Sequence, residues 1–451
     1  MLIEKIRWKD HPVLWNLELD FINPTTWKPY NTIVFAWENG TWKTTILEST
    51  STFLNKGSFE FFESIEYVSG GVKMKAKPME GSPIKDFFIM VDSSGNQTNM
   101  PINKNNPNSQ LDNDPRNIRY NGCVLSKARA DYKTKDISSS TATEIDLDKY
   151  DMDERDDFTS LKQLLIDIQT QDDSEYASLN RNLSQKWLDE RLRLEFYTES
   201  KTYRFKRAFD DFFEKINYDK VSNLDRKKTI LFLKNWKPVS IDNLSTWEKQ
   251  IVFRWAYLLK NIGNLWGSAI MIDEPELSMH PKWEQKILNY YKGLFTKNDE
   301  QIARLFIATH LEHLLKDALK DKENNLVIVL KEESWSIQQR KIDAPSILST
   351  ITSAETNYLA FDIVSNDYHI ELYWYLQNKE SKNTVKSCDN FIKGSPLYNN
   401  TKHSKPSLYS TTNYETLPTY IRNAIDHPST TWDFTEEELR LSIELLIELC
   451  K

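Results

Sequence analysis

The chain has 451 residues, of which 39% are hydrophobic and 27% charged, and its formal net charge is −8. This balance is typical of a soluble globular protein with two or three domains, and the longest apolar runs are too short to cross a bilayer. The first ten residues carry charges in place of an apolar secretion signal, and three widely spaced cysteines favour a reducing cytoplasm over a disulfide framework or a zinc site.

The N-terminal part of the chain predicts strands. Residues 2–8 and 17–21 have alternating or β-rich patterns, and residues 32–36 (TIVFA) form a short apolar run typical of a buried parallel strand. A loop is expected over residues 37–43. The spacing of residues 44–54 then predicts a helix.

The middle of the chain changes character twice. Residues 57–121 mix short strand-like runs with turn residues, and the acidic stretch 138–157 predicts a solvated loop or linker. Helical periodicity follows from residue 158 to about residue 216. Apolar strands are predicted again further on, at residues 269–272, 304–308 and 325–330.

After about residue 344 the strand patterns stop, and helical blocks are predicted at residues 355–379 and 416–450. We therefore expect an α/β fold with a helical insertion and a small C-terminal helical domain. The predicted divisions are an N-terminal lobe at 1–57, a mixed then helical insertion at 58–235, a C-terminal lobe at 236–343, and a helical domain at 344–451.

A phosphate-binding loop is predicted after the strand at residues 32–36. The form G-x-x-x-x-G-K-[ST] corresponds to W-E-N-G-T-W-K-T over residues 37–44. Lys43 is then the residue that meets the β- and γ-phosphates, and the Thr44 hydroxyl meets Mg²⁺. An ordinary strand-to-helix turn is the alternative. The predicted ATP-binding residues are Trp37, Glu38, Asn39, Gly40, Thr41, Trp42, Lys43, Thr44 and Thr45.

Two later strands end in residues suited to phosphate chemistry. The run AIMIDE ends in Asp273, a candidate ligand of Mg²⁺ together with Thr44, and in Glu274, a candidate base for the attacking water. The run LFIATH ends in His310, where contact with a γ-phosphate competes with the simpler interpretation of a hydrogen-bonded histidine at a strand end.

The segment NLSTWEKQ (residues 243–250) lies between the insertion and these strands. Ser245, Trp247 and Glu248 form a pattern in which one subunit presents a hydroxyl and a helix N-terminus to the γ-phosphate of another.

In this order, the strand, phosphate loop, long insertion, LSTxE, IMIDEPE and ATH motifs resemble the ABC-class ATPases of the RecF, SMC and OLD type. Within that class the chain resembles the AAA family ATPases of bacterial anti-phage and abortive-infection systems. Residues 272–283 (IDEPELSMHPKW) add a D-loop-like turn with Ser278 and His280. The similarity covers roughly residues 1–60 and 235–335.

This resemblance implies ATP and Mg²⁺ as cofactors, with Lys43, Thr44, Asp273, Glu274 and His310 acting on ATP. It also implies a homodimer or higher oligomer joined through the ATPase heads, with Ser245 and Glu248 acting across the interface. The family's Q-loop glutamine has no assigned counterpart in this sequence.

Tryptophans occupy positions where the family has glycine. The chain has 14 tryptophans and only 11 glycines, about 2.4% glycine against an ordinary share of about 7%. Trp37, Trp42, Trp247 and Trp255 stand at such positions. In the phosphate loop, where the backbone must approach phosphate, tryptophan adds about 1–3 kcal/mol of strain per residue and fills the phosphate volume. A loop with this sequence is expected to bind ATP poorly.

Three explanations compete for these tryptophans. A degenerate enzyme would also lose Lys43, Glu274 or His310, and a deliberate knockout would change one catalytic residue. The third explanation, which we favour, is a gene that uses UGA for glycine but was translated with a table that reads UGA as tryptophan. Trp15, Trp27 and Trp374 fit the same idea, while Trp283 looks genuine.

The last helical block carries a second motif. Thr435 and Glu438 predict a capping box at the start of the final helix. Just before it, Arg422, Asn423 and His427 form R-N-x₃-H, which resembles the R-x₄₋₆-H motif of HEPN ribonuclease domains. That resemblance implies metal-independent RNA cleavage, with histidine moving the 2′-OH proton and arginine stabilising the phosphorane. The alternative is a structural helix whose C-terminal histidine is favoured by the helix dipole.

Residues 191–207 are basic with interleaved aromatic residues, so they predict either a nucleic-acid patch or a solvated helix face. We expect a cytoplasmic ATPase with no membrane contact, whose nucleotide state controls a nuclease effector in defence. The effector is its own C-terminal domain or a nuclease or toxin partner, and nucleic acid is the ligand or target. The alternatives are a DNA-maintenance ATPase of the RecF type without nuclease activity and a scaffold that binds ATP only to assemble.

Overall fold

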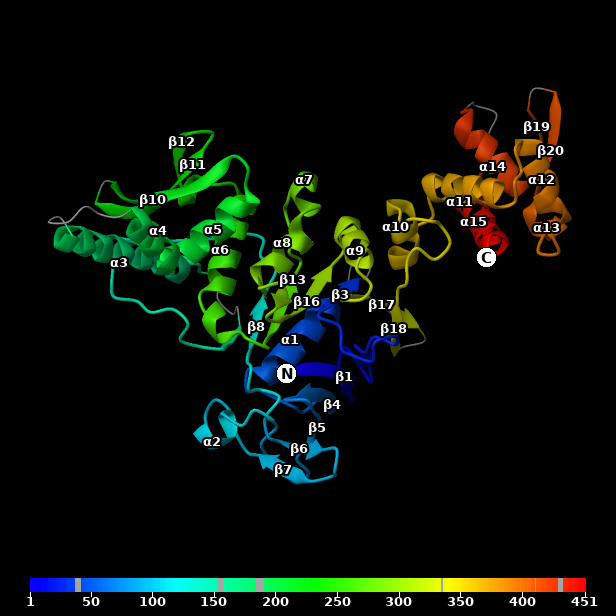
Figure 1. Ribbon diagram of the computed structural model, residues 1–451. Helices are drawn as coiled ribbons and strands as arrows, with labels where there is room; N and C mark the ends of the chain where they lie inside the picture. The colour runs from blue at the N-terminus through cyan, green and yellow to red at the C-terminus, as the bar shows by residue number, and fades with distance from the viewer. Residues whose placement is uncertain are drawn as a thin grey trace. The chain divides into compact units, whose positions relative to one another are not determined.

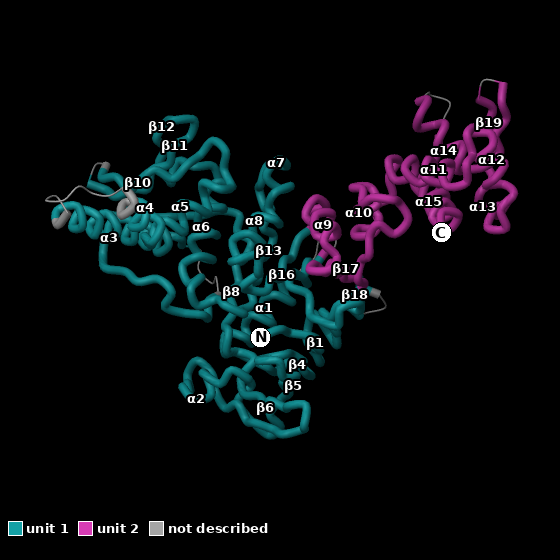
Figure 2. Tube along the Cα trace, viewed as in Figure 1, with its two compact units in different colours: residues 1–35, 40–309, 331–339 teal, residues 36–39, 310–330, 340–451 magenta. Residues whose placement is uncertain are grey.

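The computed structural model describes residues 1–36, 42–152, 157–183, 190–224, 226–333, 336–409, 411–428 and 433–451. Figure 1 shows the secondary structure, and Figure 2 divides the chain into two compact units. Unit 1 comprises residues 1–35, 40–309 and 331–339, and unit 2 comprises residues 36–39, 310–330 and 340–451.

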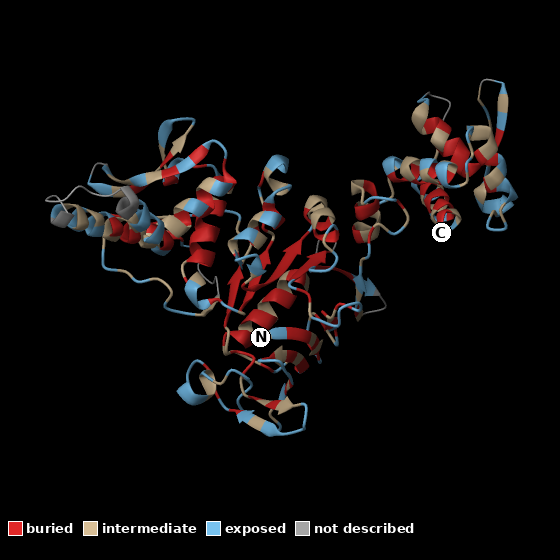
Figure 3. Cartoon of the chain, viewed as in Figure 1, coloured by how far each residue is buried: buried red, intermediate tan, exposed pale blue. Residues whose placement is uncertain are grey.

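The largest sheet has seven strands. Its strands are, in spatial order, β18 (Ser336–Lys341), β17 (Asn325–Glu333), β3 (Thr32–Ala36), β16 (Arg304–Thr309), β13 (Ala269–Asp273), β8 (Cys123–Ser126) and β9 (Tyr150–Met152). Five of them (β3, β8, β9, β13 and β16) lie wholly or almost wholly in unit 1. Strand β13 pairs in parallel with β16 and β8, and β8 pairs in parallel with β9. Every residue of β3, β8, β13 and β16 is buried (Figure 3), which explains the apolar runs of these segments.

A second, antiparallel sheet has the spatial order β2-β1-β4-β5-β6-β7. Its strands are β1 (Leu2–Trp8), β2 (Glu18–Asp20), β4 (Phe62–Ser69), β5 (Val72–Pro78), β6 (Phe88–Asp92) and β7 (Gln97–Met100). Helix α1 (Trp42–Leu54) contacts β8, β13 and β16 of the first sheet. Its last turn packs against the second sheet through Phe53, whose ring lies 5.4 Å from that of Phe88. The two sheets therefore hold α1 between them.

The insertion contains helices and a small antiparallel sheet. The helices are α3 (Thr159–Leu183), α4 (Glu190–Glu199), α5 (Lys201–Phe212) and α6 (Thr246–Leu259), and the strands are β10 (Ile216–Leu224), β11 (Lys227–Lys234) and β12 (Lys237–Ser240). The predicted helices over 158–216 are confirmed. The strands at 216–240 were not predicted, and residues 150–152, expected in a loop, form edge strand β9. In β10 a register shift between Tyr218 and Lys220 interrupts the alternation of apolar and polar residues that signals a strand.

Unit 1 also contains shorter elements that connect its longer strands and helices. They are α2 (Ser109–Asp112), η1 (Ile241–Asn243), η2 (Ile262–Asn264), α7 (Pro281–Glu284), α8 (Ile287–Leu294), β14 (Thr296–Lys297) and β15 (Glu300–Gln301).

Unit 2 is mostly helical. Helix α9 (Glu312–Leu319) lies between β16 and β17 in the chain. The elements that follow β18 are α10 (Ser353–Phe361), α11 (Asn366–Lys379), α12 (Val385–Gly394), α13 (Asn400–His403), β19 (Ser404–Tyr409), β20 (Thr412–Thr416), α14 (Leu417–Asp426) and α15 (Glu436–Cys450). Leu372, Ile421 and Ile443, from α11, α14 and α15, are fully buried in the core of unit 2. The prediction that strands stop after residue 344 is wrong, because β19 and β20 form a hairpin. Within the described ranges, no helix is both long and apolar enough to cross a membrane.

Three tryptophans have left-handed backbone conformations: Trp15 at φ 51°, Trp27 at φ 56° and Trp236 at φ 66°. Bulky residues rarely adopt this region, which glycine enters freely. Trp236 is 92% exposed and follows Asn235, itself at φ 50°, in the two-residue turn between β11 and β12. Two positive φ values in such a turn are typical of an Asn-Gly type I′ hairpin. The backbone at Trp236 thus suits glycine.

Other tryptophans have ordinary surroundings for their size. Trp255 lies inside α6, is 2% exposed and stacks 4.4 Å from the ring of Tyr290. Trp374 lies in the interior of α11, so the expectation that it occupies a glycine-like turn is wrong. A left-handed backbone therefore occurs at Trp15, Trp27 and Trp236, whereas Trp255 and Trp374 lie within helices.

Candidate nucleotide site

The predicted phosphate loop is described only from its end. Residues Trp37, Glu38, Asn39, Gly40 and Thr41 lie outside the described residues, so their predicted contacts with ATP stay predictions. Trp42 is the first residue of α1, and both Trp42 and Thr45 are half-buried in its first turn. The helix N-terminus directly follows the loop, as phosphate binding requires.

The two halves of the predicted site meet in one hydrogen bond. The hydroxyl of Thr44 donates to Oδ2 of Asp273 at 2.9 Å, across 229 positions of sequence. Asp273 ends β13 and is 4% exposed, and its Oδ1 has no hydrogen-bond partner among the described residues. A buried carboxylate with one unused oxygen beside a threonine hydroxyl suits a divalent cation that takes its other ligands from water and phosphate.

Lys43 lies next to this pair. Its Nζ donates to the carbonyl of Thr309 at 3.1 Å, and the residue is 4% exposed. Burial lowers the pKa of Lys43, while the carboxylates of Glu274, Glu276 and Asp273 act in the opposite direction. Burial also raises the pKa of Asp273, and its hydrogen bond from Thr44 opposes that shift. The site thus combines one buried ammonium with three carboxylates.

Glu274 begins the loop after β13 in a strained conformation. Its φ is 42°, which is rare for a residue with a side chain, and its backbone N–H donates to Ala308 at 2.9 Å. The side chain is half-buried. This geometry turns the chain sharply at the point where a catalytic base is predicted.

Arg254 of α6 binds the backbone of the same loop. This residue was not predicted from the sequence. Its guanidinium donates to the carbonyls of Asp273 at 3.0 Å, Glu274 at 3.3 Å and Lys127 at 2.9 Å. Arg254 is 2% exposed. It therefore links the helix that begins at the LSTxE motif to the ends of strands β13 and β8.

The LSTxE motif lies at the start of α6. Ser245 is the exposed N-cap residue, and its backbone N–H donates to Oε2 of Glu248 at 2.8 Å. Glu248 is 1% exposed and pairs with Lys234 at 2.7 Å. Trp247 is half-buried and stacks 6.1 Å from Trp283. Ser245 is thus accessible, while Glu248 acts within its own chain as a cap.

The remaining predicted residues are placed less tightly. His310 directly follows Thr309 at the end of β16 and is exposed. Ser278 is exposed at φ 63°, and His280 caps α7 by accepting from the N–H of Lys282 at 3.2 Å. Their action on ATP stays a prediction.

Mg²⁺ fits this arrangement although no cluster of three or more His, Cys, Asp or Glu side chains suited to a metal occurs in the described part of the chain. Magnesium in ATP sites is bound by one or two protein oxygens, with phosphate and water supplying the rest. Thr44 and Asp273 meet that need.

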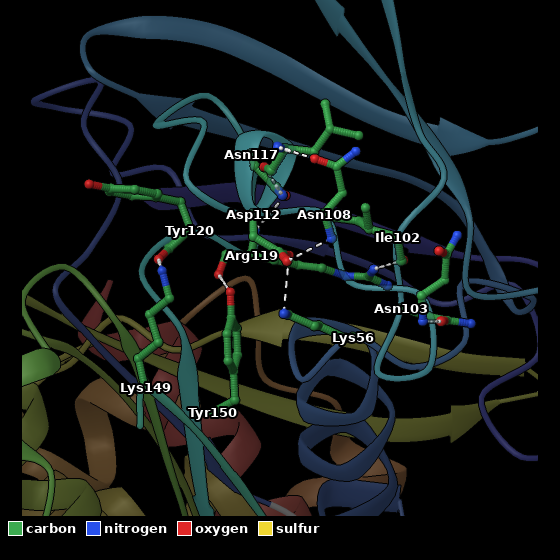
Figure 4. Close-up of polar contacts among 12 residues, drawn as sticks. Lys56, Ile102, Asn103, Asn108, Asp112, Asn117, Arg119, Tyr120, Lys149 and Tyr150 are labelled. Atoms are coloured by element: carbon green, nitrogen blue, oxygen red, sulfur yellow. Dashed lines mark hydrogen bonds and ion pairs between the residues drawn. The ribbon is translucent and has the colours of Figure 1, made fainter. Parts of the chain in front are cut away.

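The far end of α1 is fixed by a buried arginine (Figure 4). Arg119 donates to four backbone carbonyls, those of Phe53 at 2.8 Å, Gly57 at 2.7 Å, Ile102 at 3.1 Å and Asp86 at 3.1 Å. Burial lowers the pKa of Arg119 to about 9. Of these carbonyls, that of Phe53 lies in the last turn of α1, where a helix leaves carbonyls without intrahelical partners, and the other three lie outside the helix.

The C-terminal motif residues contact one another within unit 2. Arg422 pairs with Asp426 at 2.7 Å and donates to Oδ1 of Asn423 at 3.0 Å. Asn423 is 1% exposed, whereas exposed His427 stacks on Tyr409 with ring centroids 4.6 Å apart. These contacts are those of a structural helix end, so catalysis by the three residues stays a prediction.

The basic segment at residues 191–207 is described from residue 194 for its side chains. Arg204 pairs with Asp146 at 2.8 Å, Lys206 with Asp210 at 3.5 Å and Arg207 with Asp211 at 3.4 Å. Each of these cations faces a carboxylate, which favours the solvated-face interpretation.

No family model matches the chain, and no curated protein matches it. Similar solved structures include the SMC head bound to the C-winged helix domain of ScpA, at 12% identity over 76% of this chain and 99% of that one, with a TM-score of 0.40. The SMC head domain from Thermotoga maritima is 13% identical over 76% and 100% of the two chains, with a TM-score of 0.35.

The third similar structure is an Smc head domain with an extended coiled coil, bound to the C-terminal domain of ScpA derived from Pyrococcus furiosus. It is 13% identical over 76% and 96% of the two chains, with a TM-score of 0.37. The case for function therefore rests on the site itself.

Proposed function

We propose that the chain is a Mg²⁺-dependent ATPase of the ABC class, with ATP bound at the N-terminus of α1. The hydrogen bond between Thr44 and Asp273 carries this proposal, because it joins the hydroxyl and the carboxylate that hold magnesium in phosphate-loop enzymes. The parallel strands β8, β13 and β16 direct their carboxyl ends to this edge, where such proteins bind ligands.

Each residue has a distinct role in this proposal. Lys43 supplies a buried positive charge to the β- and γ-phosphates, and Glu274 orients and deprotonates the attacking water. His310 contacts the γ-phosphate. Mg²⁺, when bound by Thr44 and Asp273, neutralises charge on the phosphates.

We further propose that two heads associate around ATP. Ser245 is exposed at the N-terminus of α6, so its hydroxyl is available to the γ-phosphate on a second copy. The carboxylate of Glu248 fixes that N-terminus by capping it, so we assign Glu248 to positioning the hydroxyl.

The natural residues at Trp15, Trp27, Trp37, Trp42, Trp236 and Trp247 are, in this proposal, glycines encoded by UGA. The left-handed φ values at Trp15, Trp27 and Trp236 support it independently of any motif. The gene tests it directly, because TGG codons at Trp37, Trp42 and Trp236 would exclude recoding. Peptide masses of the protein from its natural host would give the same answer.

The cellular role that we propose is cytoplasmic defence, in which the nucleotide state controls a nuclease partner and nucleic acid is the target. Buried, unbridged Cys123, Cys388 and Cys450 suit a reducing compartment. The contacts of Arg422 and Asn423 favour a partner effector over the C-terminal domain. Loss of RNA cleavage in His427→Ala would instead identify the domain itself as the nuclease, while DNA-end binding without any nuclease would favour the DNA-maintenance alternative.

The decisive experiment measures ATP turnover in protein with glycine restored at residues 37, 42 and 247. Glu274→Gln should lower kcat by about 10²–10⁴-fold, the usual contribution of a general base, with ATP binding retained. Glu80→Gln, an exposed carboxylate on the loop after β5, is the matched control and should leave kcat unchanged. Full turnover in Glu274→Gln would refute the proposed site.

A further inference from the structure

The insertion contains a cavity that the ATPase proposal does not use. It has a volume of about 570 Å³, within the range of small-molecule sites, and it lies among α3, α4, α5 and β10. Figure 1 shows these elements next to one another. All of its lining residues are described.

Aromatic rings form much of the cavity wall. Tyr176 of α3 and Phe196 of α4 have ring centroids 5.4 Å apart, and Tyr197 of α4 and Tyr203 of α5 have centroids 5.7 Å apart. Tyr197 is 47% exposed, so the wall is accessible from solvent. Four rings around one space offer π faces to a ligand.

The charged residues of the lining are mainly acidic. Asp172, Asp173 and Asp219 are opposed by Lys206 alone, which leaves two negative charges in excess. Lys206 is also engaged, since its Nζ donates to the carbonyl of Tyr218 at 2.7 Å and lies 3.5 Å from Asp210. The cavity therefore has an unbalanced negative charge.

The three carboxylates differ in how they are occupied. Asp172 accepts the backbone N–H groups of Lys201 at 3.3 Å and Thr202 at 2.7 Å, so it caps α5. Asp173 accepts from the amide of Gln169 at 2.8 Å. Asp219 has no hydrogen bond or ion pair with the described residues. It is thus the carboxylate most available to a ligand.

A buried hydroxyl in the lining also lacks a partner. Thr202 is 6% exposed, and its Oγ1 makes no hydrogen bond to any described residue. An unpaired buried hydroxyl costs stability unless a ligand or water satisfies it. Its Oγ1 has almost no exposed surface, so the hydroxyl is not a contact for a ligand in the cavity.

We propose that this cavity binds a small aliphatic diamine, held by its ammonium groups against Asp219 and Asp173 and by its carbon chain against the aromatic wall. Aromatic faces and carboxylates together select an organic cation over a metal ion or an anion. Two excess carboxylates match two ammonium groups.

The test is calorimetric titration of the full chain with 1,4-diaminobutane, using 1,4-butanediol as the uncharged analogue. Saturable binding of the diamine and none of the diol is expected. Asp219→Asn should weaken the diamine by at least about tenfold, because it removes a charge-assisted hydrogen bond. Asp211→Asn, an exposed aspartate on the neighbouring helix α5, should leave the affinity within about twofold.

Two further arms make the outcome unambiguous. Thr202→Val replaces a hydroxyl that is not exposed to the cavity, so it is a second control and should leave binding within about twofold, with circular dichroism showing a folded protein. A trilysine peptide that binds at least tenfold more tightly than the diamine would show that the same ammonium chemistry comes from a protein chain. Equal binding of diamine and diol, or unchanged affinity in Asp219→Asn, would overturn the proposal. No nucleotide is present in these titrations, so the result is independent of the ATPase proposal.

Discussion

A buried cation lies at each end of helix α1, but the two cations have opposite environments. At the N-terminal end, Lys43 has one carbonyl partner and three carboxylates around it. At the C-terminal end, the Arg119 guanidinium donates to four backbone carbonyls. At the C-terminal end, the hydrogen-bond donors of Arg119 are used by backbone carbonyls of the protein. At the N-terminal end, Lys43 and the carboxylates around it are charged groups that a ligand can contact. The difference separates a structural cation from a functional one of similar burial.

The largest effect on stability is expected when the Arg119 hydrogen bonds at the C-terminal end of α1 are removed. Arg119→Leu removes a donor from four backbone carbonyls, so we expect it to lower the free energy of unfolding by at least about 3 kcal/mol. Urea denaturation measures this change. Arg116→Leu is the matched control, because Arg116 is largely exposed and should cost less than about 1 kcal/mol. Equal losses in the two variants would contradict the structural assignment of Arg119.

The opposite end should show the reverse behaviour. In protein with glycine restored at residues 37 and 42, Lys43→Met should lose about 2 kcal/mol or more of ATP-binding free energy, because a buried charge pair loses one partner. Its stability without ATP should change by less than about 1 kcal/mol, since burial already disfavours the charged amine. Fluorescent-ATP titration and urea denaturation test the two halves. A large loss of stability in Lys43→Met without ATP would contradict the distinction between a functional Lys43 and a structural Arg119.

Arg254 provides an intermediate case, since it donates to three backbone carbonyls yet lies at the functional end. Arg254→Met should lower kcat for ATP hydrolysis about tenfold, with KM nearly unchanged, because the Glu274 loop loses its position. Arg254→Lys retains a donor and should restore part of the rate. A change in KM alone would instead place Arg254 in substrate binding.

The tryptophan proposal includes Trp42, the first residue of α1. It is tested most cleanly away from the site, by Trp236→Gly, which should raise stability by about 1 kcal/mol through relief of the left-handed strain. Trp255→Gly, at a packed helical position, should destabilise by more than about 3 kcal/mol. Thermal unfolding compares the two, and destabilisation by Trp236→Gly would contradict the proposal.

The smallest effect is a pH dependence at Asp273. Burial raises its pKa above the ordinary 3.8, so the native state binds the proton more tightly than the unfolded state. The stability that this provides is present below pH 3.8 and is lost as pH rises through the raised folded-state value. Asp273→Asn should remove that loss, seen as a difference between the unfolding free energies of the two proteins across this range. Parallel pH profiles would contradict the shift.

The sequence predicts the buried parts of this molecule best. Strands β3, β13 and β16 are buried on both faces, so they read as uninterrupted apolar runs. The hairpin of β19 and β20 escapes detection because β19 alternates only between exposed and half-buried residues. Likewise, β12 begins with two exposed residues and has none fully buried.

In the candidate site, too, some residues can be predicted from the sequence and others cannot. Thr44 and Asp273 can be paired from sequence because each belongs to a short motif with known chemistry. Arg254 and Arg119 cannot, because their partners are backbone carbonyls, which leave no mark on the sequence. An arginine within a helix or loop ordinarily indicates a solvated surface, and only the fold reveals that these two are buried.

The long separation between Lys43 and Thr309 also determines when the site forms during synthesis. The two residues are 266 positions apart, so the lysine reaches its carbonyl only after most of the chain exists. At about 5–20 residues per second, a ribosome needs roughly 13 to 53 seconds to make the intervening segment. Throughout that interval the emerging α1 carries a lysine without its native partner. A nascent chain arrested before β16 therefore lacks the site, even when its antiparallel sheet of β1, β2 and β4–β7 is complete.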